Sequence, residues 1–103
     1  MFKYSVLYPY EKGAKFDFDY YRTKHKELVQ KHLKTFGLIK MEIDKGVSGR
    51  DNVLPPYLCV GHLYFPSRES FEKGMSQAAP ILRADIPNFT TLVPTRMLSE
   101  VLE

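Results

Sequence analysis

The chain has 103 residues, a net charge of +3 and a hydrophobic fraction of 44%, values typical of one soluble globular domain, residues 1–103. Its basic residues form no block and no apolar run approaches the roughly 20 residues that span a membrane, so neither nucleic acid nor membrane is a predicted partner. The single cysteine, Cys59, excludes an internal disulfide, and together with the polar N-terminus it favours a cytoplasmic location.

A strand at residues 2–9 is the first predicted element, because one face would carry Tyr4, Val6 and Tyr8 and the other Lys3, Ser5 and Leu7. A helix is predicted over residues 18–36. Asp17 precedes it as an N-cap, since its carboxylate can accept hydrogen bonds from the amides of the first turn. Gly37 supplies the left-handed residue that ends the helix.

One face of this helix is predicted to pack on the sheet. Phe16 and Tyr21 have the spacing of a hydrophobic staple across the helix N-terminus. At about 100° per residue, Tyr20 faces away from the sheet and a stripe of seven residues faces it. That stripe comprises Phe18, Tyr21, His25, Leu28, Val29, His32 and Phe36.

Two strands, a helix and a final strand are predicted in the rest of the chain. Residues 38–47 alternate between apolar and charged side chains, whereas residues 57–65 are apolar on both faces, as in a strand covered on both sides. Ser67 is a predicted cap for the second helix, and Pro80 is expected to break or kink it. Residues 91–101 form the last predicted strand.

The predicted order βαββαβ is that of a ferredoxin-like α+β fold, with a four-stranded antiparallel sheet and two helices on one face. The other face of the sheet needs a cover, because the strand at residues 57–65 is apolar on both sides. A second copy of the chain is the expected cover, so the sequence predicts a homodimer that associates through its sheets.

Five segments, in order along the chain, carry a family resemblance: VLYP (6–9), FDFDYYRTKH (16–25), GHLYF (61–65), ADIPNFT (84–90) and SEV (99–101). Together they resemble the EthD family of the dimeric α/β-barrel superfamily. The resemblance implies a homodimer whose two sheets form a barrel, and a role in small-molecule metabolism. Related branches of the superfamily include monooxygenases, cyclases and lactone isomerases that use a cleft between helices and sheet.

His25 is the candidate catalytic residue. An imidazole can act as acid or base near neutral pH, and the histidine lies on the inward stripe and in a segment that carries the resemblance. The family pattern H-x-P-L-V is altered here to HKELV at residues 25–29, which makes the helix more regular. The alternative is a core histidine held by one hydrogen bond. His32, seven residues on, lies about 10.5 Å along the helix, too far to share a metal with His25, so no metal site is predicted.

Four further residues are candidates for substrate binding. Tyr21 offers a phenolic hydroxyl but can also be a core residue, and His62 and Tyr64 share one face of their strand, where a pocket or a dimer interface is possible. Asp85 can orient a histidine, fix the dimer or form a turn. Apart from these four, Arg96 can bind an anion or form an exposed ion pair.

The function predicted from these residues is binding of a hydrophobic or aromatic small molecule in a helix–sheet cleft. The family resemblance implies that the chemistry would be that of an oxidoreductase or of a cofactor-independent oxygenase or isomerase. No nicotinamide, flavin or nucleotide motif occurs, so no cofactor is predicted. The alternative is a non-catalytic accessory module that binds a ligand or a partner protein.

Overall fold

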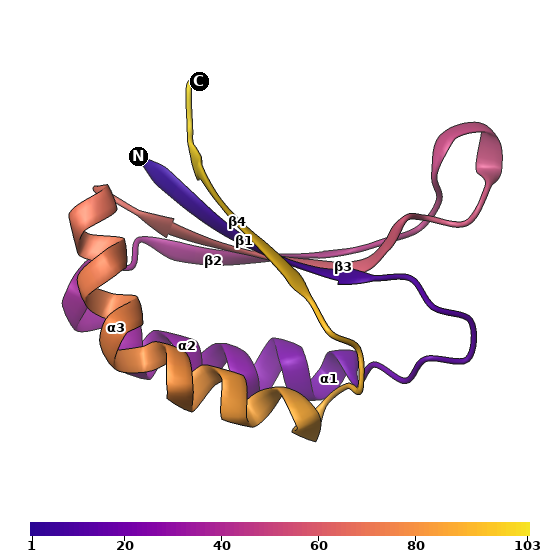
Figure 1. The fold of residues 1–103 in the computed structure, drawn as a ribbon, viewed down its shortest axis with the longest axis horizontal. Coiled ribbons are helices and arrows are strands. Elements are labelled where there is room, and N and C mark those ends of the chain that lie inside the picture. The colour runs from indigo at the N-terminus through magenta and orange to yellow at the C-terminus, as the bar shows by residue number, and fades with distance from the viewer.

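The computed structural model describes residues 1–103 and contains one four-stranded sheet with its helices on one face (Figure 1). The first helix is made of four consecutive segments: α1 (Phe18–Tyr20), a π-helical turn at Tyr21–His25, α2 (Lys26–Leu33) and a 3₁₀ turn at Lys34–Phe36. The remaining elements are β1 (Phe2–Pro9), β2 (Lys40–Lys45), β3 (Tyr57–Phe65), α3 (Arg68–Asp85) and β4 (Thr95–Glu100), with short 3₁₀ turns at Arg50–Asn52 and Ile86–Asn88.

The strand order is β2-β3-β1-β4 and every pairing is antiparallel, which confirms the predicted ferredoxin-like α+β fold. Val6 in β1 lies opposite Gly61 in β3 and Arg96 in β4, so these three residues share the face that meets the helices. β3 has the predicted limits, whereas β2 and β4 are shorter than the predicted 38–47 and 91–101. No helix is both long and apolar enough to cross a membrane.

The N-terminus of the first helix has the predicted capping contacts. The Asp17 side chain accepts a hydrogen bond of 3.0 Å from the Tyr20 amide. The rings of Phe16 and Tyr21 pack 5.3 Å apart, the contact expected of the staple. Gly37 ends the helix with a φ of 92°, a left-handed value that favours glycine.

The π-helical turn was not predicted, and it changes which side chains face inward. The Lys26 amide donates to the Tyr21 carbonyl five residues back, so one turn holds an extra residue. Tyr21, His25, Val29 and Leu33 form the fully buried series, whereas the predicted stripe omitted Leu33. Tyr20, expected to face away, is half-buried.

The second helix begins as predicted but does not break at Pro80. The Ser67 hydroxyl accepts a hydrogen bond from the Ser70 amide at 3.1 Å. α3 then continues past Pro80 to Asp85, so of the two expected outcomes, a break or a kink, the break does not occur. Proline removes only the amide that would bond the Ser76 carbonyl, and both residues are exposed, so water can satisfy that carbonyl. The continuation carries the last turn of α3 to the site described next.

The core lies between the sheet and the helices. Its fully buried side chains come from both layers, and they leave a cavity rather than filling the layer completely. The largest of them are Tyr8, Tyr21, Val29, Leu33, Cys59 and Phe65.

Candidate functional site

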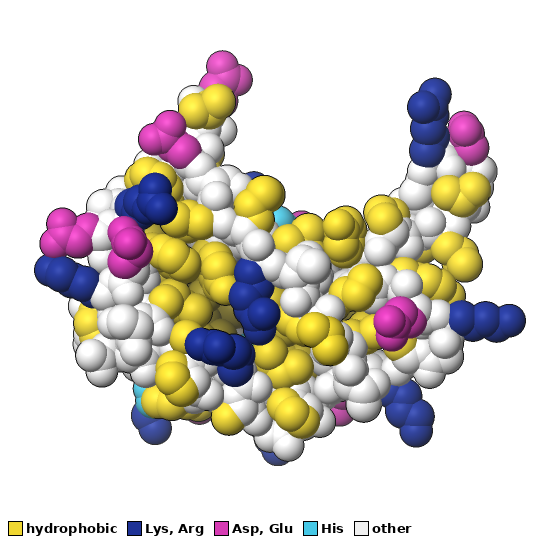
Figure 2. All heavy atoms as spheres, in the orientation of Figure 1, with side chains coloured by type: hydrophobic (Ala, Val, Ile, Leu, Met, Phe, Trp, Pro, Cys, Tyr) yellow, Lys and Arg dark blue, Asp and Glu magenta, His cyan; other side chains and the backbone are white.

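A cavity of about 250 Å³ lies between the helices and the inner face of the sheet. Figure 2 shows it as a hollow in an apolar surface, with basic side chains at its edge. Eleven of its 14 lining residues are hydrophobic, so the cavity suits an apolar molecule. The lining comprises Tyr4, Val6, Tyr8, Tyr21, His25, Val29, Met41, Leu63, Met75, Ala79, Leu82, Arg83, Ile86 and Arg96.

His25 contributes the imidazole of this cavity, and Asp85 orients it. The histidine ends the π-helical turn and is 6% exposed. Its Nδ1 lies 2.9 Å from Oδ2 of Asp85, the last residue of α3. An ionised carboxylate only accepts, so Nδ1–H donates this hydrogen bond and the neutral ring carries its lone pair on Nε2.

The Asp85 carboxylate is held by two further donors. The Tyr20 hydroxyl donates to Oδ1 at 2.7 Å, and the Asn88 side-chain amide donates to the same oxygen at 2.9 Å. Burial alone would raise the pKa of Asp85, but the hydrogen bonds from Tyr20, Asn88 and His25 outweigh it and lower the pKa below its usual value. Asp85 is therefore ionised at neutral pH and fixes the orientation of the His25 ring.

The second nitrogen of His25 is unpaired and accessible, and His25 is a lining residue of the cavity. Nε2 has no protein partner, yet no buried side-chain nitrogen or oxygen is left unpaired, so Nε2 must reach open space. Burial lowers the pKa of His25, and the hydrogen bond and charge of Asp85 only partly offset that effect. The ring is accordingly neutral at pH 7, the state in which Nε2 can accept a proton.

Tyr21 lines the cavity beside His25. The two rings are stacked, with centroids 5.2 Å apart and an angle of 15° between their planes. The Tyr21 hydroxyl reaches β3, where a Cβ at Gly61 would collide with it, so this glycine makes room for the tyrosine. Burial, and next the neighbouring Tyr8, raise the pKa of Tyr21, which therefore stays protonated and can donate a hydrogen bond.

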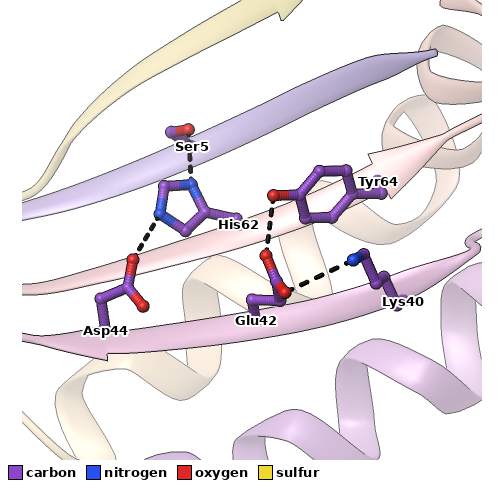
Figure 3. Close-up of polar contacts among 6 residues, drawn as sticks. All are labelled: Ser5, Lys40, Glu42, Asp44, His62 and Tyr64. Atoms are coloured by element: carbon purple, nitrogen blue, oxygen red, sulfur yellow. Dashed lines mark hydrogen bonds and ion pairs between the residues drawn. The ribbon is translucent and has the colours of Figure 1, made fainter. Parts of the chain in front are cut away.

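His62 and Tyr64, the other two expected binding residues, lie on the opposite face of the sheet (Figure 3). His62 lies between the Ser5 hydroxyl, 2.9 Å from Nδ1, and the Asp44 carboxylate, 2.9 Å from Nε2. The Tyr64 hydroxyl donates to Glu42 at 2.7 Å. The structure therefore brings His25, Tyr21 and Asp85 together and leaves His62 and Tyr64 outside the cavity.

Three residues of the site were missed in the sequence. Tyr20 and Asn88 hold Asp85, and Arg83 lines the cavity. Asn88 lies in the segment ADIPNFT, so its spacing from Asp85 was a usable signal. Tyr20 gave no signal, because it was expected to face away from the sheet and its partner, Asp85, lies 65 positions along the chain.

The remaining ionisable groups offer no metal or thiol chemistry. No group of three or more His, Cys, Asp or Glu side chains is placed to hold a metal ion. Cys59 is fully buried, and burial raises the pKa of its thiol to about 12, so the sulfur behaves as a small hydrophobic group.

Comparison with known proteins places the fold and the family. A family model described as the EthD domain matches residues 13–92. An EthD-like protein from Ralstonia eutropha JMP134 is 29% identical, with a TM-score of 0.91 over 99% of this chain and 92% of that one. An EthD family protein from Bacillus halodurans C-125 is 22% identical, with a TM-score of 0.77 over 99% of both chains.

A more distant structure shares the fold alone. SnoaB from Streptomyces nogalater, a cofactor-independent oxygenase, is 9% identical, with a TM-score of 0.58 over 99% of this chain and 91% of that one. No curated protein matches in sequence.

Proposed function

The chain belongs to the EthD family, and from the geometry of its cavity we propose that it binds a hydrophobic small molecule there and removes a proton from it. His25 is the catalytic base and Asp85 positions it. The observation that carries this proposal is an oriented, neutral imidazole that lines an apolar cavity and keeps Nε2 free of protein partners.

The proton transfer follows from the site's geometry. A C–H or O–H group of the ligand gives its proton to Nε2 of His25, and the resulting imidazolium is stabilised by the Asp85 carboxylate at 2.9 Å. The anion left on the ligand can accept a hydrogen bond from the protonated Tyr21 hydroxyl on the same wall. Returning the proton to a different atom gives isomerisation, and reaction of the anion with oxygen gives oxygenation without a cofactor, the chemistry named for SnoaB.

The test is hydrogen exchange in a small ketone. We expect the protein to speed deuterium exchange at the acidic C–H positions of 1-phenylpropan-2-one in D₂O, followed by NMR. His25→Ala and His25→Gln should remove this acceleration, since a positioned base contributes roughly 10²- to 10⁴-fold. His62→Ala is the matched control, because it removes an imidazole from the opposite face and should leave exchange unchanged. Exchange no faster than in buffer would contradict the catalytic role.

A non-catalytic binding module is the second candidate, and the packing of His25 favours it. The imidazole lies against Phe89, with centroids 4.8 Å apart, as well as against Tyr21, so it also contributes to an aromatic core. If the protein only binds its ligand, 1-phenylpropan-2-one binds but its deuterium exchange is no faster than in buffer. His25→Ala then lowers the melting temperature and leaves the ligand affinity nearly unchanged.

Association of two copies through the sheet is part of the proposal. The outer face of the sheet carries no helix (Figure 1), and it presents Met97, 56% exposed, beside half-buried Leu7 and Val60. A second copy packed there, as in a dimeric barrel, would cover these side chains and leave the cavity open on the other face. Sedimentation equilibrium should give a dimer, and Val60→Asp should give a monomer; a wild-type monomer would contradict this step.

A further inference from the structure

Arg83 and Arg96 line the cavity from opposite layers. Arg83 comes from the last turns of α3, and Arg96 comes from β4 opposite Val6. The third residue of the lining that is not hydrophobic, His25, is neutral and pairs with Asp85, so only the two arginines carry a charge. The cavity therefore has an apolar wall, a base and two permanent positive charges.

Neither arginine has an acidic partner. The Arg83 guanidinium makes one contact, a hydrogen bond of 3.4 Å from Nε to the Ala79 carbonyl, and Arg96 makes no side-chain hydrogen bond or ion pair. The ion pair expected as one alternative for Arg96 is thus not formed. Arginine presents donors in a planar fork that matches an oxyanion, and here both forks have unused donors.

Tyr4 lines the same cavity as the two arginines. Burial raises the pKa of Tyr4, and the charges of Arg96 and Arg83 act on it in the opposite direction. Because both cations line one cavity and lack a counter-ion, an anion placed between them would be stabilised by both. Figure 2 shows basic side chains at the edge of the hollow, surrounded by hydrophobic atoms.

We propose that the ligand of this cavity is an acid, with a small hydrophobic body inside the cavity and one anionic group held by Arg83 and Arg96. A carboxylate is the smallest such group. This assignment rests on the proposed function, since it concerns the same cavity. The volume of about 250 Å³ lies below the roughly 300–1,000 Å³ of pockets for drug-sized molecules, so the body is the size of a single ring with a short chain.

The test compares 3-phenylpropionate with its neutral amide, 3-phenylpropionamide, by NMR titration at one low ionic strength. These probes have the same shape and differ in charge. We expect the acid to bind at least about tenfold more tightly, since a hydrogen bond to a charged group adds that much. In the double variant Arg83→Gln/Arg96→Gln the two affinities should become equal, with the amide unchanged.

The matched control is Arg50→Gln/Arg68→Gln, which lowers the net charge equally at exposed arginines outside the cavity. It should keep the preference for the acid. Two results would overturn the anion site but not the binding function of the cavity. One is equal affinity of the wild type for the acid and the amide, and the other is a preference for the acid that persists in Arg83→Gln/Arg96→Gln. Binding of neither probe would overturn the binding function itself and this assignment with it.

Discussion

Two histidine–aspartate pairs lie on opposite sides of one sheet and have the same nitrogen–oxygen distance, but they differ in burial and in the ring nitrogen that contacts the aspartate. His25 and Asp85 are 2.9 Å apart with side-chain exposures of 7% and 12%, whereas His62 and Asp44 are also 2.9 Å apart but with exposures of 16% and 68%. Distance is the same, so burial decides what each pair can do.

The two pairs also differ in whether the histidine keeps a ring nitrogen without a protein partner. His62 uses both ring nitrogens, one toward Ser5 and one toward Asp44, and so has no lone pair for a ligand (Figure 3). His25 uses only Nδ1 and leaves Nε2 without a protein partner. Under the proposed function the inner pair transfers a proton, whereas the outer pair links neighbouring strands.

The largest difference is expected when each aspartate loses its charge. Asp85→Asn should slow the ketone exchange by about 100-fold, because it removes the carboxylate that orients His25 and stabilises its imidazolium. Asp44→Asn should leave the rate unchanged. The pH–rate profile separates positioning from folding, since loss of the carboxylate lowers the pKa of His25 further and moves the midpoint to lower pH. A midpoint that stays in place would contradict the positioning role.

An intermediate effect is expected at the wall of the cavity. Gly61→Ala places a methyl group against the Tyr21 hydroxyl and should lower the free energy of unfolding by about 1–3 kcal/mol, the usual effect of overpacking. Tyr21→Phe removes the colliding atom, so Gly61→Ala should be less harmful in that background. Chemical denaturation of the two single variants and the double variant measures the coupling, and strictly additive effects would contradict the contact.

The fold was predictable from the sequence where local chemistry decides it. Asp17, Gly37 and Ser67 act through backbone hydrogen bonds and left-handed geometry, which need no knowledge of the tertiary structure. The site was predictable only in part, because the contact between His25 and Asp85 joins residues 60 positions apart. The break considered at Pro80 did not occur because the carbonyl it leaves unpaired is exposed to solvent, and Tyr20 was misjudged because its partner, Asp85, lies 65 positions away.

The smallest expected effect is the pH dependence of stability due to His25. Its pKa in the folded protein is lower than the unfolded value near 6.5, so between these two values the unfolded chain binds more protons. The free energy of unfolding should therefore fall as pH is lowered from about 6.5 through the folded pKa, and the contribution is fully present above 6.5. His25→Gln should flatten this part of the curve, whereas His62→Gln should not. Urea denaturation between pH 5 and about pH 7 measures it. A slope that survives in His25→Gln would mean that another group titrates there, and the neutral, buried state of the inner pair would no longer explain its difference from the outer one.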